Sequence, residues 1–316
     1  MKLKMNSSFL IGHYTNAAQG TGCTVILPPE NNITSASVKG ASPGTREIAL
    51  LAPDKKISSV HAILLTGGSA FGLHAAQGIM EILHSRGIGY QTDYGIVPIV
   101  PAAVIFDKNV GDASAYPAIE EAKIALKNAK ENNRISGNVG AGTGATVGKW
   151  RGLNYAMKGG LGVAHIISGK LEITALSVVN AVGDIYDRNH NIIAGAINEQ
   201  DIFFADLKPF HETQKPKVGM AENTVLCAVM INAKISKTQA AYLAERVHFG
   251  ISRRIEPSHT SYDGDVAFVI SHPEIDYDLD LLASSMIDTV ESSVINAVIT
   301  AETAYGIRSY KEIFSK

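Results

Sequence analysis

The segment from residue 137 to residue 162 constrains the fold more than any other, because nine of its residues are glycine. Each glycine inside a helix costs roughly 0.5–1 kcal/mol relative to alanine, so a helix over this segment is excluded. Tight turns and close approach between backbones are the physical uses of so many glycines. We therefore expect a tightly turned segment here, with the regular elements of the fold on either side.

The first third of the chain is expected to alternate strands and helices. Residues 61–65 form a short apolar run that ends in Thr66-Gly67-Gly68-Ser69, a pattern typical of a buried strand entering a turn. Apolar residues at helical spacing then predict a helix ending near Gly87, and residues 115–130 predict a second, solvated helix. Between these helices, residues 97–106 predict a buried irregular segment or a short strand.

Beyond the glycine-rich segment, strand patterns dominate. Residues 162–168 and 171–182 predict two strands joined by a hairpin at Gly169-Lys170. The polar stretch 186–222 predicts a long exposed loop. It is followed by residues 225–231, which have the uninterrupted apolar character of a buried strand.

The C-terminal region continues with helices on either side of a strand. Ser236 and Gln239 form a capping box, which predicts the start of a helix. Residues 266–270 predict a strand, and residues 279–305 predict a long final helix. The sequence shows no internal repeat, so we expect residues 1–316 to form a single globular unit of the α/β class.

Composition argues against several classes of partner. The formal net charge of −2 provides no overall attraction for nucleic acid or an anionic membrane, so neither is expected as a partner. The longest uncharged apolar stretch, residues 95–106, is far shorter than the ~20 residues of a membrane span, and no signal peptide is evident. The two cysteines are far apart, and the histidines are scattered. We therefore expect a cytoplasmic protein with no disulfide, metal or other cofactor.

The Asn223-Thr224 pair offers a specific chemistry, because the threonine stands directly between a long polar stretch and a buried strand. If the bond between the two residues is cut, Thr224 gains a free α-amine beside its own hydroxyl. That amine has a reference pKa of ~7.7–8.0, so it can act as a general base near neutral pH. The hydroxyl could itself cut the bond by attacking the Asn223 carbonyl. The alternative is that Thr224 simply begins a strand.

Two other motifs combine a structural interpretation with a functional one. Gly67, Gly68 and Ser69 could form only a strand-to-helix turn with Ser69 as N-cap, or could aim backbone N–H groups at a substrate carboxylate. Asp263 and Asp265 could lie in a simple turn, or could form a carboxylate pair that shares a proton or holds an ammonium group.

Taken together, these residues resemble the DmpA/BapA family of self-cleaving aminopeptidases. That family includes the L-aminopeptidase/D-esterases, the β-peptidyl aminopeptidases and the nylon-oligomer hydrolases. The resemblance covers residues 10–270 in ordered blocks: Pro43-Gly-Thr-Arg-Glu47, Leu65-Thr-Gly-Gly-Ser-Ala-Phe-Gly-Leu73, Val97-Pro-Ile-Val-Pro-Ala102, Gly137-Asn-Val-Gly-Ala-Gly-Thr-Gly144, Lys158-Gly-Gly-Leu-Gly162, Val178-Val-Asn-Ala-Val-Gly-Asp184, Asn223-Thr224 and Asp263-Gly-Asp265.

The resemblance implies an αββα sandwich like that of N-terminal nucleophile hydrolases. It also implies self-cleavage into residues 1–223 and 224–316, with an oligomer of such paired chains. Thr224 would be the nucleophile, with Lys158 and Asn180 beside it and with Asp263 and Asp265 completing the site. The threonine and the two aspartates resemble the nylon-hydrolase branch, because the founding aminopeptidases use serine and a Ser…Glu pair.

We expect an amide or peptide hydrolase that releases an N-terminal residue from a peptide or small amide. Asn180 would donate an amide N–H to the oxyanion, and Lys158 would hold the Thr224 amine neutral. An acyltransferase of the ornithine acetyltransferase type, which passes the acyl group to an amine, is the alternative enzyme. A binding protein that uses the glycine-rich loops is the alternative without catalysis.

Overall fold

The computed structural model describes residues 8–213 and 223–314, and in these residues two five-stranded sheets lie face to face. The first sheet has the order β1-β2-β5-β8-β4 (Leu10–Asn16, Thr21–Leu27, Ile63–Thr66, Ala102–Val104, Thr45–Arg46). The second has the order β11-β12-β15-β17-β3 (Gly160–Ser168, Leu171–Asn180, Thr224–Ala233, Gly264–Ile275, Ile33–Gly40).

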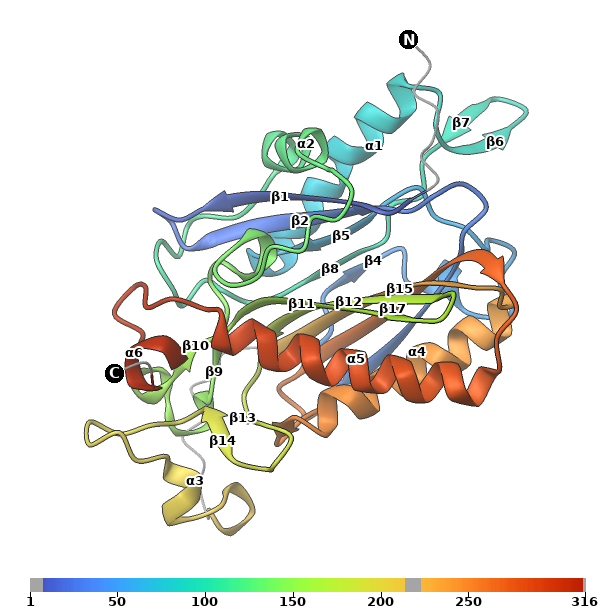
Figure 1. Ribbon diagram of the computed structural model, residues 1–316. Helices are drawn as coiled ribbons and strands as arrows, with labels where there is room; N and C mark the ends of the chain where they lie inside the picture. The colour runs from blue at the N-terminus through green and yellow to red at the C-terminus, as the bar shows by residue number, and fades with distance from the viewer. Residues whose placement is uncertain (1–7, 214–222, 315–316) are drawn as a thin grey trace.

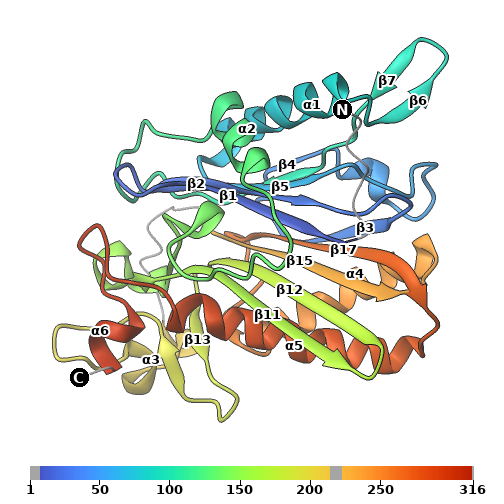
Figure 2. The same ribbon diagram turned by 45° about the horizontal axis from the view of Figure 1, so that its top comes forward.

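Helices cover the outer face of each sheet (Figures 1 and 2). Helices α1 (Ala76–Ser85) and α2 (Ile119–Lys127) lie on the first sheet, and α4 (Lys237–Ser252) and α5 (Leu279–Ile299) lie on the second. The layers therefore follow the order helix, sheet, sheet, helix. This order confirms the αββα sandwich that the resemblance implies.

Strand β15 shows how the second sheet is buried on both faces. Its side chains alternate between two apolar layers, as the period of a strand requires. Val225, Cys227 and Val229 pack in the layer that α4 and α5 cover, whereas Leu226 and Ala228 pack between the two sheets. Burial on both faces accounts for the uninterrupted apolar run that predicts this strand.

The glycine-rich segment contains no α-helix, as its composition predicts. It is built from short 3₁₀ turns (Gly140–Gly142, Lys149–Arg151, Leu153–Tyr155) and two short strands, β9 (Thr146–Val147) and β10 (Met157–Lys158). A Cβ atom on Gly142 would lie 2.1 Å from the amide nitrogen of Leu161. Only glycine permits this close approach between the segment and β11.

Most expected elements are present, including the β11–β12 hairpin and the capping box of Ser236 and Gln239 that begins α4. The first third is less regular than expected, because strands β1, β2 and β3 precede the first helix. The helix expected over residues 279–305 is α5, and it ends at Ile299. Tyr305 and Gly306 both adopt positive φ in a tight turn, which a helix cannot contain.

The expectation of a long exposed loop over 186–222 is wrong for its first part. Strands β13 (Asp184–Tyr186) and β14 (Ile192–Ala194) pair there, and the short helix α3 (Phe204–Leu207) follows. Ala196 is buried in a small apolar cluster with Trp150 and Val182. These partners lie far apart in the sequence, so no local pattern marks them. Residues 214–222 lie outside the described part of the chain.

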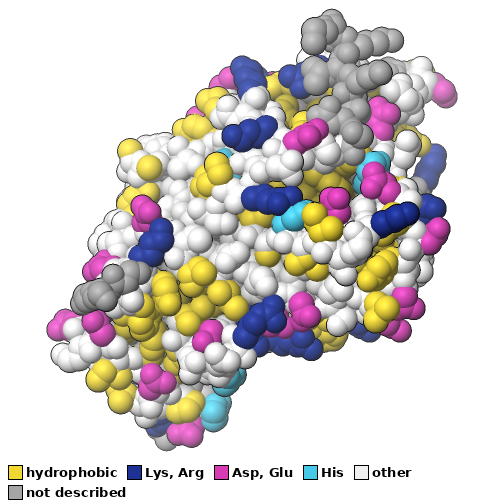
Figure 3. Space-filling view, viewed as in Figure 1, with side chains coloured by type: hydrophobic (Ala, Val, Ile, Leu, Met, Phe, Trp, Pro, Cys, Tyr) yellow, Lys and Arg dark blue, Asp and Glu magenta, His cyan; other side chains and the backbone are white. Residues whose placement is uncertain are grey.

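Short elements complete the molecule. The hairpin of β6 (Tyr90–Thr92) and β7 (Gly95–Val97) projects from the body, β16 (Ile255–Glu256) pairs with β13, and α6 (Tyr310–Phe314) lies near the C-terminus (Figure 1). In the view of Figure 3, hydrophobic side chains gather at the surface around α6, whereas charges of both signs are scattered elsewhere. Among the described helices, none is long and apolar enough to cross a bilayer.

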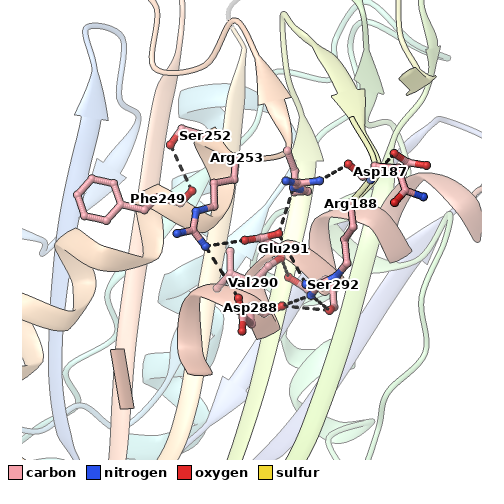
Figure 4. A network of polar contacts seen from close by, with 12 residues as sticks. Asp187, Arg188, Phe249, Ser252, Arg253, Asp288, Val290, Glu291 and Ser292 are labelled. Atoms are coloured by element: carbon pink, nitrogen blue, oxygen red, sulfur yellow. Dashed lines mark hydrogen bonds and ion pairs between the residues drawn. The ribbon is translucent and has the colours of Figure 1, made fainter. Parts of the chain in front are cut away.

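A buried carboxylate in the interior of α5 fastens this helix to the C-terminal end of α4 and to the loop that follows β13 (Figure 4). Glu291 on α5 pairs with Arg253 at 3.0 Å and with Arg254 at 3.2 Å. Arg188, which also donates to the Asp288 carbonyl and the Ser292 hydroxyl, lies 4.0 Å from the same carboxylate. Several partners for one charge offset the desolvation that its burial requires.

Candidate active site

Thr224 is the first residue of β15 and lies where three neighbouring strands meet. In register it is paired with Asn180, the last residue of β12. The preceding residue, Asn223, forms an isolated parallel β-bridge with Asp263, the residue directly before β17. Thr224 is buried, yet it lines a pocket of about 300 Å³. The rest of the pocket lining is uncharged: Ser42, Pro43, Gly44, Ser69, Ala70, Val104 and Phe106.

The carbonyl group before Thr224 is held by two donors. The backbone N–H of Gly264 donates to the Asn223 oxygen at 2.9 Å, and the Thr224 hydroxyl donates to the same oxygen at 2.5 Å. The N–H of Asn223 in turn donates to the Tyr262 carbonyl at 2.9 Å. The peptide bond between Asn223 and Thr224 is therefore fixed on both sides, with a backbone donor aimed at its oxygen as in an oxyanion hole.

Asp265 joins strand β15 to a histidine. One carboxylate oxygen accepts the N–H of Val225 at 2.6 Å, and the other lies 2.6 Å from Nδ1 of His259. Burial lowers the tendency of His259 to carry a proton, but the hydrogen bond and charge of Asp265 outweigh burial, so the pKa of His259 is raised. Asp265 thus holds the residue that follows Thr224 and a partly buried histidine at the same time.

Asp263 has an environment of its own. Its side chain accepts hydrogen bonds at 2.7 Å from the backbone N–H and from the hydroxyl of Thr260. Burial, and then the charge of Asp265, raise the pKa of Asp263 to about 6, while Thr260 and the cation of Lys149 act in the opposite direction. Asp263 is therefore suited to exchange a proton near neutral pH.

Lys149 is the cation that contacts Asn180. Its ammonium group donates to the side-chain oxygen of Asn180 at 2.8 Å and to the backbone oxygen of the same residue at 3.1 Å. The amide nitrogen of Asn180 donates to the Phe106 carbonyl at 3.0 Å. These contacts lock the orientation of the Asn180 amide. Burial lowers the pKa of Lys149 to about 7, and the charge of Asp263 partly opposes this effect.

Lys158 is also buried, but its hydrogen bonds go elsewhere. It donates to the carbonyl oxygens of Thr143 and Ala145 at 3.0 and 2.7 Å. Burial lowers the pKa of Lys158 to about 7. Its link to the site runs through the glycine-rich segment, because Thr146 pairs with Lys158 in register and donates to the Asn180 side chain.

The backbone N–H groups of Gly67, Gly68 and Ser69 do not form the expected anion site. All three donate to protein acceptors: the Gly22 carbonyl, the Asp107 carboxylate and the Ile105 carbonyl, respectively. Ser69 is also not an N-cap, because the 3₁₀ helix Ser69–Ala75 follows Gly68 without a side-chain cap. Asp107 lies far away in the sequence, so no local pattern predicts that its carboxylate accepts the Gly68 N–H. Ser69 still belongs to the site through the lining of the Thr224 pocket.

Comparison with protein families shows the class of enzyme to which this site belongs. Residues 7–311 match the model of peptidase family S58. The chain belongs to peptidase family S58. It is therefore a hydrolase of peptide or amide bonds, and the acyltransferase alternative is not favoured.

Relatives of this S58 peptidase agree with the assignment. An uncharacterised aminopeptidase of Mycobacterium leprae is 33% identical, and the match covers 98% of this chain and 92% of the relative. A 6-aminohexanoate-oligomer endohydrolase of Kocuria sp. is 31% identical, with 81% of this chain and 70% of the relative covered.

Solved structures confirm the fold. The β-aminopeptidase of Burkholderia sp. superposes with a TM-score of 0.72 at 15% identity, covering 98% of this chain and 90% of that chain. The L-aminopeptidase D-Ala-esterase/amidase of Ochrobactrum anthropi, described as a variant of the Ntn hydrolase fold, superposes with a TM-score of 0.71 at 18% identity, covering 94% and 86%.

The S58 peptidase site contains two residues that the sequence analysis left unassigned, Lys149 and His259. Lys149 stands in the glycine-rich segment two residues before Arg151, and nothing in this short basic stretch shows which of the two side chains turns inward. His259 lies four residues before Asp263 in a loop, where no periodic pattern reveals which way a side chain points. Among the described residues, no group of three or more His, Cys, Asp or Glu side chains could hold a metal ion.

Proposed function

We propose that this S58 peptidase cuts its own chain between Asn223 and Thr224 and then uses Thr224 as an N-terminal nucleophile to hydrolyse amide bonds. One observation carries the proposal: the threonine hydroxyl and the Gly264 N–H meet on the carbonyl oxygen of Asn223. In the proposed processed form, residues 1–223 and 224–316 stay together, because β15 is hydrogen-bonded in register between β12 and β17.

Self-cleavage starts with attack of the Thr224 hydroxyl oxygen on the Asn223 carbonyl carbon. The Gly264 N–H stabilises the negative charge that develops on the carbonyl oxygen. Asp263, which forms a β-bridge with Asn223 and whose pKa is raised to about 6, is the proposed acceptor of the hydroxyl proton. The C–N bond breaks as the nitrogen gains a proton and becomes the α-amine of Thr224. Water then hydrolyses the ester and releases the Asn223 carboxylate.

Turnover repeats this chemistry on a substrate. The α-amine takes the hydroxyl proton, the Thr224 oxygen attacks the substrate carbonyl, and an acyl-enzyme forms as the amine product leaves. Water then attacks the ester and frees the acid product. The Asn180 amide has two N–H groups, and since one is bound to Phe106, the other is the candidate oxyanion donor.

The proposed substrates are short peptides or small amides from which an N-terminal residue is released. The relatives support amide chemistry in general, since their names include aminopeptidases and an endohydrolase of amide oligomers. We further propose that the enzyme acts in the cytoplasm as an oligomer of processed protomers. The two cysteines, both free and buried, support the compartment, and size-exclusion chromatography tests the assembly.

Trapping of the acyl-enzyme tests the nucleophile. Processed enzyme is mixed with p-nitrophenyl acetate, quenched in acid and weighed by mass spectrometry. We expect one acetyl group on the fragment that begins at Thr224, and none on residues 1–223. Thr224→Ser serves as the control that should still acylate. Acetylation confined to the larger fragment would contradict the proposal.

A further inference from the structure

Two chain segments that line the Thr224 pocket continue directly into an exposed group of side chains. Ser69 and Ala70 line the pocket and are followed by Phe71, while Phe106 lines it and is followed two residues later by Lys108. Phe71, Lys108 and Tyr116 form this group, which we call the aromatic platform. Tyr116 is joined to the same corner, because a Cβ atom on Gly68 would lie 2.3 Å from the Tyr116 Cβ.

The aromatic platform has the geometry of a binding surface. The ring centroids of Phe71 and Tyr116 are 5.4 Å apart with a tilt of 30°. The Lys108 ammonium lies 5.3 Å from the first centroid and 5.6 Å from the second. Phe71 is 61% exposed and Tyr116 is 42% exposed, so both rings present apolar surface to solvent beside the pocket. Two adjacent exposed rings with a cation over them offer a ligand both apolar contact and positive charge.

The charge of Lys108 is available to a ligand. Within the described chain, Lys108 makes no ion pair inside 4 Å. Two carboxylates lie near enough to feel its charge, Asp107 and Asp112. Asp107 already accepts from Gly68 and Thr21, and Asp112 accepts from Ser114 and Gln19. A ligand carboxylate could therefore form an ion pair with Lys108 without breaking an existing one.

The pocket itself suits a different part of the substrate. Its lining is uncharged and its volume is about 300 Å³, which favours a small acyl group. The acyl group becomes bonded to Thr224 and must stay in the pocket, whereas the leaving group must face the exit. The aromatic platform continues directly from two segments of the pocket lining, residues 69–70 and Phe106, and offers exposed apolar surface next to them.

We propose that the aromatic platform binds the leaving group of the substrate and selects an aromatic residue with a free carboxylate, as at the C-terminal end of a short peptide. This inference rests on the proposed function. The rings of Phe71 and Tyr116 would contact the aromatic side chain, and Lys108 would attract the carboxylate. Cation–π contacts and ion pairs at exposed sites are weak, so the expected selectivity is severalfold.

The test compares three dipeptide substrates on processed enzyme: alanyl-phenylalanine, alanyl-phenylalaninamide and alanyl-alanine. We expect Lys108→Met to reduce the preference for the free acid over the amide about threefold, mainly through KM. Phe71→Ala should reduce the preference for phenylalanine over alanine by a similar factor. Lys56→Met is the matched control, because it also removes a lysine that lies over an aromatic ring. The Lys56 ammonium is 5.6 Å from the ring centroid of Tyr90, a residue of the projecting β6–β7 hairpin.

Unchanged ratios in Lys108→Met and Phe71→Ala, or equal changes in Lys56→Met, would overturn the platform assignment while leaving the proposed function intact. A chain that stays unprocessed and hydrolyses none of the three dipeptides would contradict the proposed function and the platform together. Processing of the variants, followed on a denaturing gel, separates these two outcomes, because self-cleavage is expected to depend on Thr224 and on the Gly264 N–H rather than on the platform side chains.

Discussion

The backbone N–H of Gly264 lies 2.9 Å from the carbonyl oxygen of Asn223, in the bond that precedes Thr224. The donor belongs to the residue between Asp263 and Asp265, so one short segment supplies both the polarising N–H and the two carboxylates. Because Asp263 and Asp265 contact different groups, we expect each carboxylate to have a separable task.

Asp265 should contribute mainly to stability and to the position of β15. Asp265→Ala leaves the Val225 N–H and His259 without their acceptor, so we expect a loss of about 1–3 kcal/mol in the free energy of unfolding. Asp265→Asn keeps an oxygen for Val225 and should lose less. Urea denaturation measures both changes in a Thr224→Ala background, where every chain is expected to be unprocessed. Equal stability of the two variants would contradict this role.

Asp263 should control the pH dependence of self-cleavage. Its pKa of about 6 means that it is protonated below that pH and ionised above it. Because only the ionised form can accept the Thr224 proton, the processing rate should rise as pH increases through about 6. Before cleavage residue 224 has no α-amine, so that group cannot cause the rise. Asp263→Asn should process slowly and without this rise, as a gel time course at several pH values would show.

Lys149 should set the midpoint of the same pH profile. Its cation lowers the pKa of Asp263, so Lys149→Met should move the rise in processing rate to a higher pH. Lys158→Met is the matched control, since Lys158 is equally buried but contacts the Thr143 and Ala145 carbonyls instead. The same shift in both variants would show that loss of any buried cation suffices, and would remove the specific role of Lys149.

Parts of this site followed from the sequence because local patterns mark them. Thr224 stands at a sharp change from polar to apolar residues, and the two aspartates are adjacent to a strand pattern. Lys149 was missed because lysine is almost never fully buried, so a sequence gives no reason to place it inside. Its contact with Asn180 joins residues from separate elements, and such contacts leave no trace in local spacing.

The helices and strands of the fold were also predictable from local sequence patterns, whereas the stacking of the sheets into layers was not. The capping box at Ser236 and the apolar run of β15 are local signals. The stacking of the two sheets was expected only from the family resemblance. The β13–β14 region was missed because its buried residues are scattered along a polar stretch, and their apolar partners come from other parts of the chain, as Trp150 does for Ala196.

Glu291 should be important for stability and unimportant for catalysis. Glu291→Ala removes the acceptor of several arginines at a buried position, so we expect a loss of about 3–5 kcal/mol in the free energy of unfolding. Asp288→Ala is the control, because this exposed carboxylate lies 3.9 Å from Arg253 and should contribute less than about 1 kcal/mol. Chemical denaturation of both variants in the Thr224→Ala background tests the difference, and a similar loss in both would contradict it.

The intact mass of the purified protein under denaturing conditions tests the central claim most directly. Division of the 33.6 kDa chain in proportion to residue number predicts fragments of about 24 and 10 kDa, with Thr224 at the N-terminus of the smaller one. Thr224→Ser should give the same two fragments, and Thr224→Ala should stay at full length because it lacks the hydroxyl. A wild-type protein that remains a single chain after long incubation, or that is cut at any other bond, would contradict the account.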